Sequence, residues 1–216
     1  MLGLAPKTLT VFDRVAALKS IQGFLLVGGT GIALQIRHRL SEDLDFCKWV
    51  PKSNVNNAIS VKIIEKELAE NFNEVQTNHL SFDQVDFRIE GVKLTFFNEV
   101  GLNPPNFSPI PYKGNIFGVP LALHGAMKVK TIFQRITYRD YYDVYTLLSE
   151  KYLSLEELIN ASIEYQSKLN KGIILKRLVA WDSIKGNAGL AHLSAKYSIS
   201  AEEMGEFFIG EIKLLE

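Results

Sequence analysis

The chain has 216 residues, of which 47% are hydrophobic and 22% are charged, and its 24 basic side chains balance its 24 acidic ones. This length allows one sizeable core or two small domains, and a net charge of zero excludes a protein that is drawn to nucleic acid by bulk charge alone. We expect no membrane partner, because no apolar run approaches the roughly 20 residues of a membrane helix. We also expect a cytoplasmic protein, because the N-terminus lacks a signal-peptide pattern and the single cysteine excludes an internal disulfide.

A strand and a glycine pair open the informative part of the chain. Residues 24–27 form an apolar run that predicts a buried strand. Gly28 and Gly29 follow it and let the backbone turn sharply and approach a bound group closely. We predict a short helix over residues 31–37 with Thr30 as its N-cap. Free backbone amides at such a helix start are suited to a phosphate.

The next strand carries Asp43 and Asp45, which are separated by one apolar residue. Because side chains alternate along a strand, the two carboxylates share one face, while Leu44 and Phe46 point into the core. Two carboxylates on one strand face near a phosphate-binding turn are what a magnesium–nucleotide site needs. Each part alone also has a plainer interpretation, since a glycine pair is commonly only a turn and an Asp-x-Asp pair is commonly a solvated face.

The remaining pattern predicts an α+β fold in which a small mixed sheet precedes a helical C-terminal half. Residues 101–120 hold five of the seven prolines, and we interpret residues 101–119 as the connection between the halves. In the first half we expect helices over residues 12–21 and 55–72, strands over 74–80 and 82–90, and a strand over 92–97 that completes a hairpin through Gly91. In the second half we expect helices over residues 121–136, 140–150, 154–169, 172–181 and 201–215.

Two blocks of this sequence resemble a known family. The first, VGGTGIALQIRHRLSEDLDF, is similar to the signature of the AbiEii/AbiGii toxin family of nucleotidyltransferases, a branch of the DNA polymerase beta-like superfamily. The second, AMKVKTIFQRITYRDYYDVYTLL, resembles the lysine helix of that family and the aspartate-bearing helix after it. We therefore expect a nucleotidyltransferase-like domain over residues 1–105 and a helical domain, which begins with the Pro-rich connecting loop, over residues 106–216.

The resemblance implies a metal-dependent activity that moves an NMP from an NTP to an acceptor, either an RNA such as tRNA or a protein. It also implies Mg²⁺ (or Mn²⁺) as the cofactor, a toxin–antitoxin or phage-defence setting, and a cognate antitoxin as a partner. Asp43, Asp45 and Lys128 are the catalytic candidates, and the two aspartates would hold the metal. The nucleotide-binding candidates are Gly28, Gly29, Thr30, Arg39, Ser41, Lys128, Arg135, Asp140 and Asp143.

Several of these side chains have structural alternatives. His124, Lys128 and Arg135 fall on one helical face, which could be solvated, and His124 stands where many family members carry an acid. Asp140 and Asp143 could act as helix-capping acids or, as the resemblance implies, bind the nucleotide or position the lysine. The basic run at residues 37–39 could meet phosphates or end a helix in solvent, and Lys168, Lys171, Lys176 and Arg177 could form a solvated helical face.

One position departs from the pattern of the superfamily, which usually places a third carboxylate on a later strand. The matching position here is Thr95, a poor metal ligand compared with a carboxylate. Asp86, on the partner strand of the predicted hairpin, is a substitute candidate. A non-catalytic nucleotide-binding module and a protein-interaction component therefore remain alternative functions.

Overall fold

A computed structural model of the chain describes residues 2–51, 59–100, 106–184 and 190–215. The chain divides into two compact units, each of which is discontinuous in sequence. The first comprises Met1–Ile36 and Leu40–Pro120, and the second comprises Arg37–Arg39 and Leu121–Glu216. The domain boundary predicted at residue 105 lies outside the described residues.

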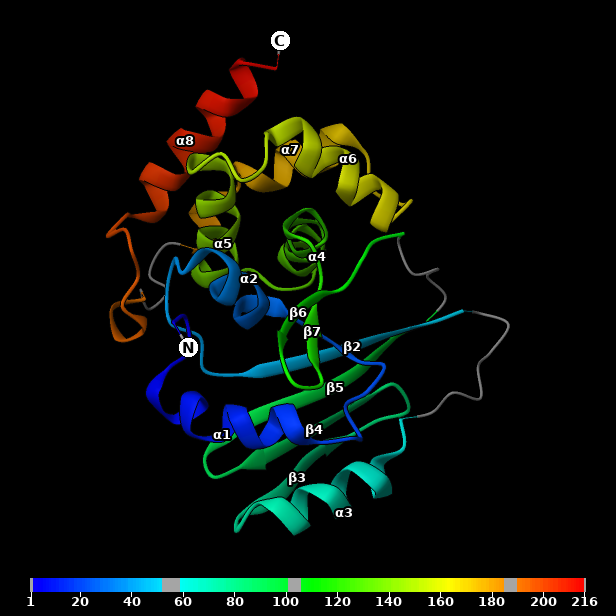
Figure 1. The fold of residues 1–216 in the computed structure, drawn as a ribbon. Coiled ribbons are helices and arrows are strands. Elements are labelled where there is room, and N and C mark those ends of the chain that lie inside the picture. Colours follow the sequence, from blue (N-terminus) through cyan, green and yellow to red (C-terminus); the bar gives the residue numbers. More distant parts are fainter. Residues whose placement is uncertain (1, 52–58, 101–105, 185–189, 216) are drawn as a thin grey trace. The chain divides into compact units, whose positions relative to one another are not determined.

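The first unit is built on a seven-stranded mixed sheet with the strand order β3-β4-β5-β2-β1-β7-β6 (Figure 1). The sheet is mixed because β2 runs antiparallel to β1 and parallel to β5. Its strands are β1 (Leu25–Val27), β2 (Leu44–Val50), β3 (Val75–Leu80), β4 (Gln84–Ile89), β5 (Val92–Val100), β6 (Ile110–Lys113) and β7 (Ile116–Gly118), and its helices are α1 (Pro6–Ala17), α2 (Gly28–Ile36) and α3 (Val61–Asn71). The predicted α+β class is confirmed.

The apolar face of this sheet and two helices form the core of the unit. Figure 1 shows α1 and α3 against the same face of the sheet. Phe12 of α1 and Leu68 of α3 are fully buried there with Leu44, Phe46 and Phe96 of the strands. Burial of this surface supplies the main favourable free energy of folding, and it fixes which face of β2 is left for polar side chains.

Helix boundaries in this unit differ from the predicted ones for local reasons. The first helix begins at Pro6, because proline is well suited to the first helical position. The helix predicted over residues 55–72 is observed only as Val61–Asn71; residues 55–58 lie outside the described part, and Ser60 is its N-cap. The N-cap prediction for Thr30 is wrong, because α2 begins two residues earlier and places Thr30 inside the helix.

The Pro-rich segment contributes more than a connection. Its described part forms β6 and β7, and β7 pairs in parallel with β1. The turn between these strands contains Gly114, which has a φ of +51°. Pro111 is tolerated because β6 is an edge strand of the sheet. The sheet is therefore two strands wider than the sequence predicted.

The second unit is helical, as predicted. Its α-helices are α4 (Leu121–Gln134), α5 (Tyr138–Ser149), α6 (Leu155–Tyr165), α7 (Lys171–Leu178) and α8 (Ala201–Lys213), and short 3-10 helices cover Trp181–Ile184 and Ala191–Leu193. In Figure 1, α4 lies among α5, α6 and α7. Capping boxes at Ser154 and Ser200 set the starts of α6 and α8. No helix among the described residues is long and apolar enough to cross a bilayer.

Candidate functional site

The two predicted acids lie at the start of β2. Asp43 directly precedes the strand and Asp45 is its second residue, and both are half-buried. Leu44 and Phe46, which alternate with them, are buried in the core. The predicted alternation is therefore confirmed, and it leaves two carboxylates on one face of the sheet.

Gly28 makes room for one of these carboxylates. It has a φ of +68°, and a Cβ atom added at this position would lie 2.6 Å from Asp45 Oδ2. Only glycine combines this backbone conformation with so close an approach. The glycine that follows β1 and begins α2 therefore lies close to the Asp45 carboxylate. That the first amides of α2 bind a phosphate beside it stays a prediction.

We predict that Gly28→Ala removes activity by displacing the Asp45 carboxylate. Gly23→Ala is the matched control, because Gly23 has a φ of +85° and a Cβ there would meet nothing within 4 Å. Both variants should lose about 1–2 kcal/mol of stability from the left-handed backbone alone. Denaturant melts and a nucleotide-transfer assay should show a loss of transfer only for Gly28→Ala; equal activity of the two variants would contradict the proposed packing role.

Thr30 and Ser41 hold the segment that leads into β2. The buried Thr30 hydroxyl donates to the Asp43 carbonyl oxygen and lies 2.8 Å from Ser41 Oγ. This side chain links the third residue of α2 to the backbone of the acid-bearing segment. Because its hydroxyl is engaged in this way, the phosphate contact that we predict for Thr30 rests on its backbone amide.

The strand register places Thr95 directly opposite Asp45 and Asp86 directly opposite Thr95. Directly paired residues project from the same face of a sheet, so the three side chains form a row across β2, β5 and β4. The Thr95 hydroxyl is buried and makes no hydrogen bond of ordinary geometry to a described residue. The sequence assignment of Thr95 to the acid-bearing face is confirmed.

Asp86 is held by neighbours on its own side of this row. Its carboxylate lies 2.9 Å from Lys93 Nζ and accepts a 2.9 Å hydrogen bond from Gln84 Nε2. Burial alone would raise the pKa of Asp86, but Lys93, Gln84 and the nearby Thr95 hydroxyl bring it below the ordinary value. Within the described ranges, no three His, Cys, Asp or Glu side chains are arranged to hold a metal.

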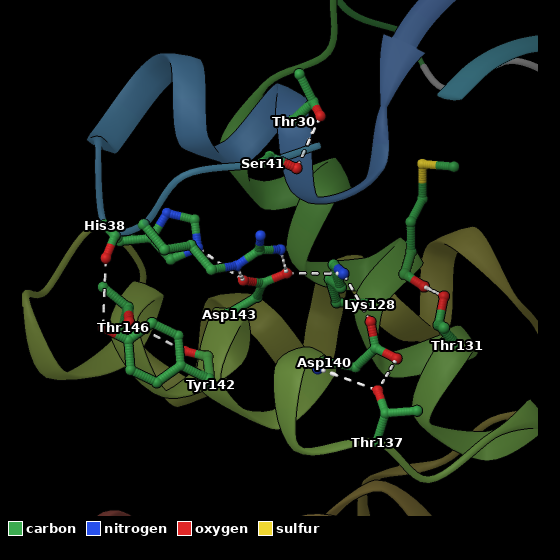
Figure 2. Close-up of polar contacts among 12 residues, drawn as sticks. Thr30, His38, Ser41, Lys128, Thr131, Thr137, Asp140, Tyr142, Asp143 and Thr146 are labelled. Atoms are coloured by element: carbon green, nitrogen blue, oxygen red, sulfur yellow. Dashed lines mark hydrogen bonds and ion pairs between the residues drawn. The ribbon is translucent and has the colours of Figure 1, made fainter. Parts of the chain in front are cut away.

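In the second unit, a fully buried carboxylate gathers three basic side chains. Asp143 accepts hydrogen bonds from Arg39 through Nε at 2.7 Å and Nη2 at 3.0 Å. Its Oδ1 is also 2.7 Å from His38 Nε2, and its Oδ2 is 2.7 Å from Lys128 Nζ (Figure 2). Two-point contact with a guanidinium is a strong and directional interaction. The Asp143 cluster therefore ties α4, α5 and Arg37–Arg39 together.

Lys128 connects this carboxylate to a second one. Its Nζ is 2.7 Å from Asp140 Oδ1 as well as 2.7 Å from Asp143. Asp140 also accepts from the Thr137 hydroxyl at 2.6 Å and from Arg135 Nε at 3.1 Å. The N-cap of α5 is Thr137, and Asp140 is the acid three residues later. Asp140 thus belongs to the capped helix start and also contacts the lysine.

Electrostatics keeps both carboxylates ionised despite their burial. Burial alone would raise the pKa of Asp143, but Arg39, Lys128 and the His38 hydrogen bond hold it well below the usual range. The pKa of Asp140 is lowered in the same way, against burial, mainly by Lys128. Burial lowers the pKa of His38, so this ring is neutral and donates through Nε2. The cluster then contains two anions balanced by Arg39 and Lys128, with Arg135 at its edge.

The basic run at residues 37–39 is not a solvated helix end. His38 and Arg39 are buried, and only Arg37 is exposed. Sequence reasoning placed His38 in a basic run but missed its contact with Asp143. It also missed Tyr142, whose hydroxyl lies 3.3 Å from the His38 carbonyl oxygen. The available signal was the spacing of Asp140 and Asp143, which are three residues apart and therefore share one face of the predicted helix.

His124 lies one turn before Lys128 on α4 and is fully buried. Neither of its ring nitrogens hydrogen-bonds to a described residue. Burial, with a smaller contribution from the charge of Lys128, lowers the pKa of His124 to about 3. The ring is therefore neutral in the folded protein at pH 7.

This pKa predicts a pH-dependent stability. Between pH 6.5 and about 3 the unfolded chain binds a proton at His124 and the folded chain does not, so stability falls as pH falls. His124→Leu should remove this proton uptake and flatten the dependence by up to about 1.4 kcal/mol per pH unit. Urea melts of both proteins at pH 7, 6, 5 and 4 measure the difference. Parallel stability curves would contradict a neutral buried imidazole.

The chain is similar to known proteins over nearly its whole length. A family model described as "Nucleotidyl transferase AbiEii toxin, Type IV TA system" matches residues 12–208. An uncharacterized protein of Aquifex aeolicus (strain VF5) is 26% identical over 204 residues, which are 93% of this chain and 92% of that protein.

Two solved structures share the fold. JHP933 from Helicobacter pylori aligns with a TM-score of 0.52 and 16% identity over 98% of this chain and 94% of its own. MenT4, a nucleotidyltransferase toxin from Mycobacterium tuberculosis H37Rv, aligns with a TM-score of 0.58 and 13% identity over 96% of this chain and 83% of its own. At these identities the similarity extends to the fold alone.

Proposed function

The chain belongs to the AbiEii nucleotidyl transferase toxin family of type IV toxin–antitoxin systems, and on that premise we propose that it moves an NMP from an NTP to an RNA acceptor such as tRNA. The observation that carries the proposal is the pairing of Asp43 and Asp45 on one strand face, with Gly28 packed against the Asp45 carboxylate. A cognate antitoxin is the protein partner that we propose for it.

The donor set of the acid pair fits a hard divalent cation. Carboxylate oxygens are the ligands that Mg²⁺ and Mn²⁺ prefer, and Mg²⁺ is commonly bound through one or two carboxylates together with substrate phosphates. Asp43 and Asp45 would hold such an ion, which would neutralise charge on the triphosphate.

In the proposed reaction a hydroxyl oxygen of the acceptor forms a bond to the α-phosphorus of the NTP. The bond from that phosphorus to the bridging oxygen breaks, and pyrophosphate leaves. The backbone amides of Gly28, Gly29 and Thr30 would orient the phosphates. We assign the hydroxyl proton to solvent, because the register puts Thr95, and no acid, beside Asp45.

Lys128 is the proposed cation for the nucleotide phosphates. An ammonium has three donor protons, and the contacts to Asp140 and Asp143 account for two of them. The third would serve a phosphate oxygen, while the two carboxylates hold the amine in place. This assignment follows from the family resemblance, and the ion pairs support it as a positioning device for the lysine.

Incubation with each labelled NTP, Mg²⁺ and total tRNA tests the proposal. We expect a labelled RNA product and stoichiometric pyrophosphate for at least one NTP, and no product after EDTA treatment. Thermal stabilisation by nucleotide without turnover would favour a non-catalytic nucleotide-binding module, which the Thr95 position makes the second candidate. No product and no stabilisation would contradict both and favour a protein-interaction component.

A further inference from the structure

The region around α7 carries a concentration of basic side chains that the chemistry above does not use. Between Glu164 and Asp182 the chain contains four basic side chains, Lys168, Lys171, Lys176 and Arg177, and no acidic one, although the chain as a whole has a net charge of zero. A local excess of this size creates a positive potential even in a neutral protein.

Some exposed lysines of the chain are paired with acids and others are not. Lys113 and Lys196 form 2.6 Å and 2.7 Å ion pairs with acids. In contrast, Lys168, Lys171 and Lys176 are exposed and form no ion pair with any residue that the structure defines. Their ammonium groups are therefore accessible to an anionic ligand.

Aromatic rings connect this region to one side of α4. The Arg177 guanidinium carbon lies 5.1 Å from the centre of the Phe133 ring, and Lys130 Nζ lies 5.6 Å from that of Tyr165. Lys130 and Phe133 are one turn apart on α4 and therefore share a face. The Tyr141 hydroxyl anchors α7 through a 2.7 Å hydrogen bond to the Arg177 carbonyl oxygen.

We use the name basic surface for the cations of α7, of the connection between α6 and α7, and of the face of α4 that contacts them. Its members are Lys130, Lys168, Lys171, Lys176 and Arg177. We propose that this basic surface binds the phosphodiester backbone of the RNA acceptor. The inference rests on the proposed function for the identity of the acceptor, and on charge complementarity for the location.

RNA fits the basic surface better than an acidic protein does. A polyanionic backbone is bound through many exposed lysine and arginine contacts that displace counterions, and such binding needs no apolar centre. A stable protein interface usually adds buried aromatic or apolar anchors, whereas Phe133 and Tyr165 lie beneath cations here. A protein whose net charge is zero also needs a local basic surface to attract RNA at a useful rate.

Charge reversal on the intact chain tests the proposal. The test variant is Lys168→Glu/Lys171→Glu/Lys176→Glu, and the matched control is Lys7→Glu/Lys62→Glu/Lys66→Glu, which reverses three exposed lysines of the first unit. Binding of fluorescent tRNA is measured without NTP at several salt concentrations. The test variant should bind at least about tenfold more weakly. The slope of its plot of log Kd against log salt concentration should be shallower by about 2, since each phosphate contact contributes roughly 0.7–0.9 to that slope.

The control should keep wild-type affinity and salt dependence. Equal losses in both variants, wild-type binding by the test variant, or no tRNA binding by the wild-type protein would each overturn the proposal. Unchanged tRNA binding with lost binding to a polyglutamate peptide would assign the surface to an acidic protein and overturn it too. If the test variant melts early, the Lys→Gln triple variant replaces it. The binding assay contains no NTP and is therefore independent of nucleotide transfer. If the wild-type protein binds tRNA at this surface but transfers no nucleotide in the separate transfer assay, only the proposed function is refuted.

Discussion

Asp143→Ala should destabilise the protein by about 3–5 kcal/mol, the largest loss of stability that we expect from a single substitution. The carboxylate is fully buried and compensates Arg39 and Lys128, which are also buried. Its removal leaves two cations in a low-dielectric environment with only Asp140 to offset them. Urea unfolding monitored by circular dichroism at pH 7 measures the difference.

Asp13→Ala is the matched control for this prediction. Asp13 forms a 2.6 Å ion pair with Lys113, similar in length to the Asp143 pairs, but its side chain is 66% exposed. An exposed pair is worth about 0–1 kcal/mol, so this variant should unfold close to the wild-type midpoint. Similar midpoints for the two variants would refute the view that burial makes the Asp143 cluster essential for stability.

Asp43→Ala and Asp45→Ala should each reduce nucleotide transfer by about a thousandfold or more while the fold persists. Two half-buried carboxylates on a polar strand face contribute ligand charge, whereas the core residues Leu44 and Phe46 provide the packing of the same strand. Loss of a carboxylate that holds the metal weakens charge neutralisation in the transition state, and interactions of this kind supply several kcal/mol. Transfer of labelled NMP to tRNA measures the effect.

Glu42→Ala serves as the control, because Glu42 is an exposed acid next to the pair. It should transfer nucleotide at a rate close to that of the wild-type protein. Melting curves of the two aspartate variants should stay near the wild-type curve, because relief of repulsion between neighbouring carboxylates offsets lost contacts. Full transfer by either aspartate variant would remove the basis for a metal site at this strand.

The parts of the fold that could be predicted are those set by local periodicity. The alternation at Asp43, Leu44, Asp45 and Phe46 defined the two faces of β2 because the side-chain period of a strand is two. The hairpin at Gly91 was predictable for the same reason, since a turn residue separates two strand patterns. The short strands β6 and β7 were not, because the segment that contains them is rich in proline, like a loop, and the pairing of β7 with β1 is non-local.

In the candidate site, too, the features set by local sequence could be predicted and the long-range contacts could not. The acids and the glycine pair lie within 18 residues of one another and carry a recognisable spacing. The contact of His38 with Asp143 joins residues 105 positions apart, and no local pattern indicates it. From the sequence, Arg39 and Lys128 were predicted to contact phosphate, whereas in the structure both are buried against the Asp143 carboxylate. The roles of these residues toward a nucleotide stay predictions.

Residues Arg37–Arg39 belong to the second unit, although the chain before and after them belongs to the first. A single cut in the chain therefore cannot separate the two units. A fragment that ends at Pro120 retains His38 and Arg39 without Asp143, and the complementary fragment keeps Asp143 and Lys128 without Arg39. Each fragment then contains charged side chains that have lost buried partners of opposite charge. We therefore expect neither half to act as a self-contained module, because three residues of the segment that joins α2 to the acid-bearing strand, Arg37–Arg39, belong to the helical unit.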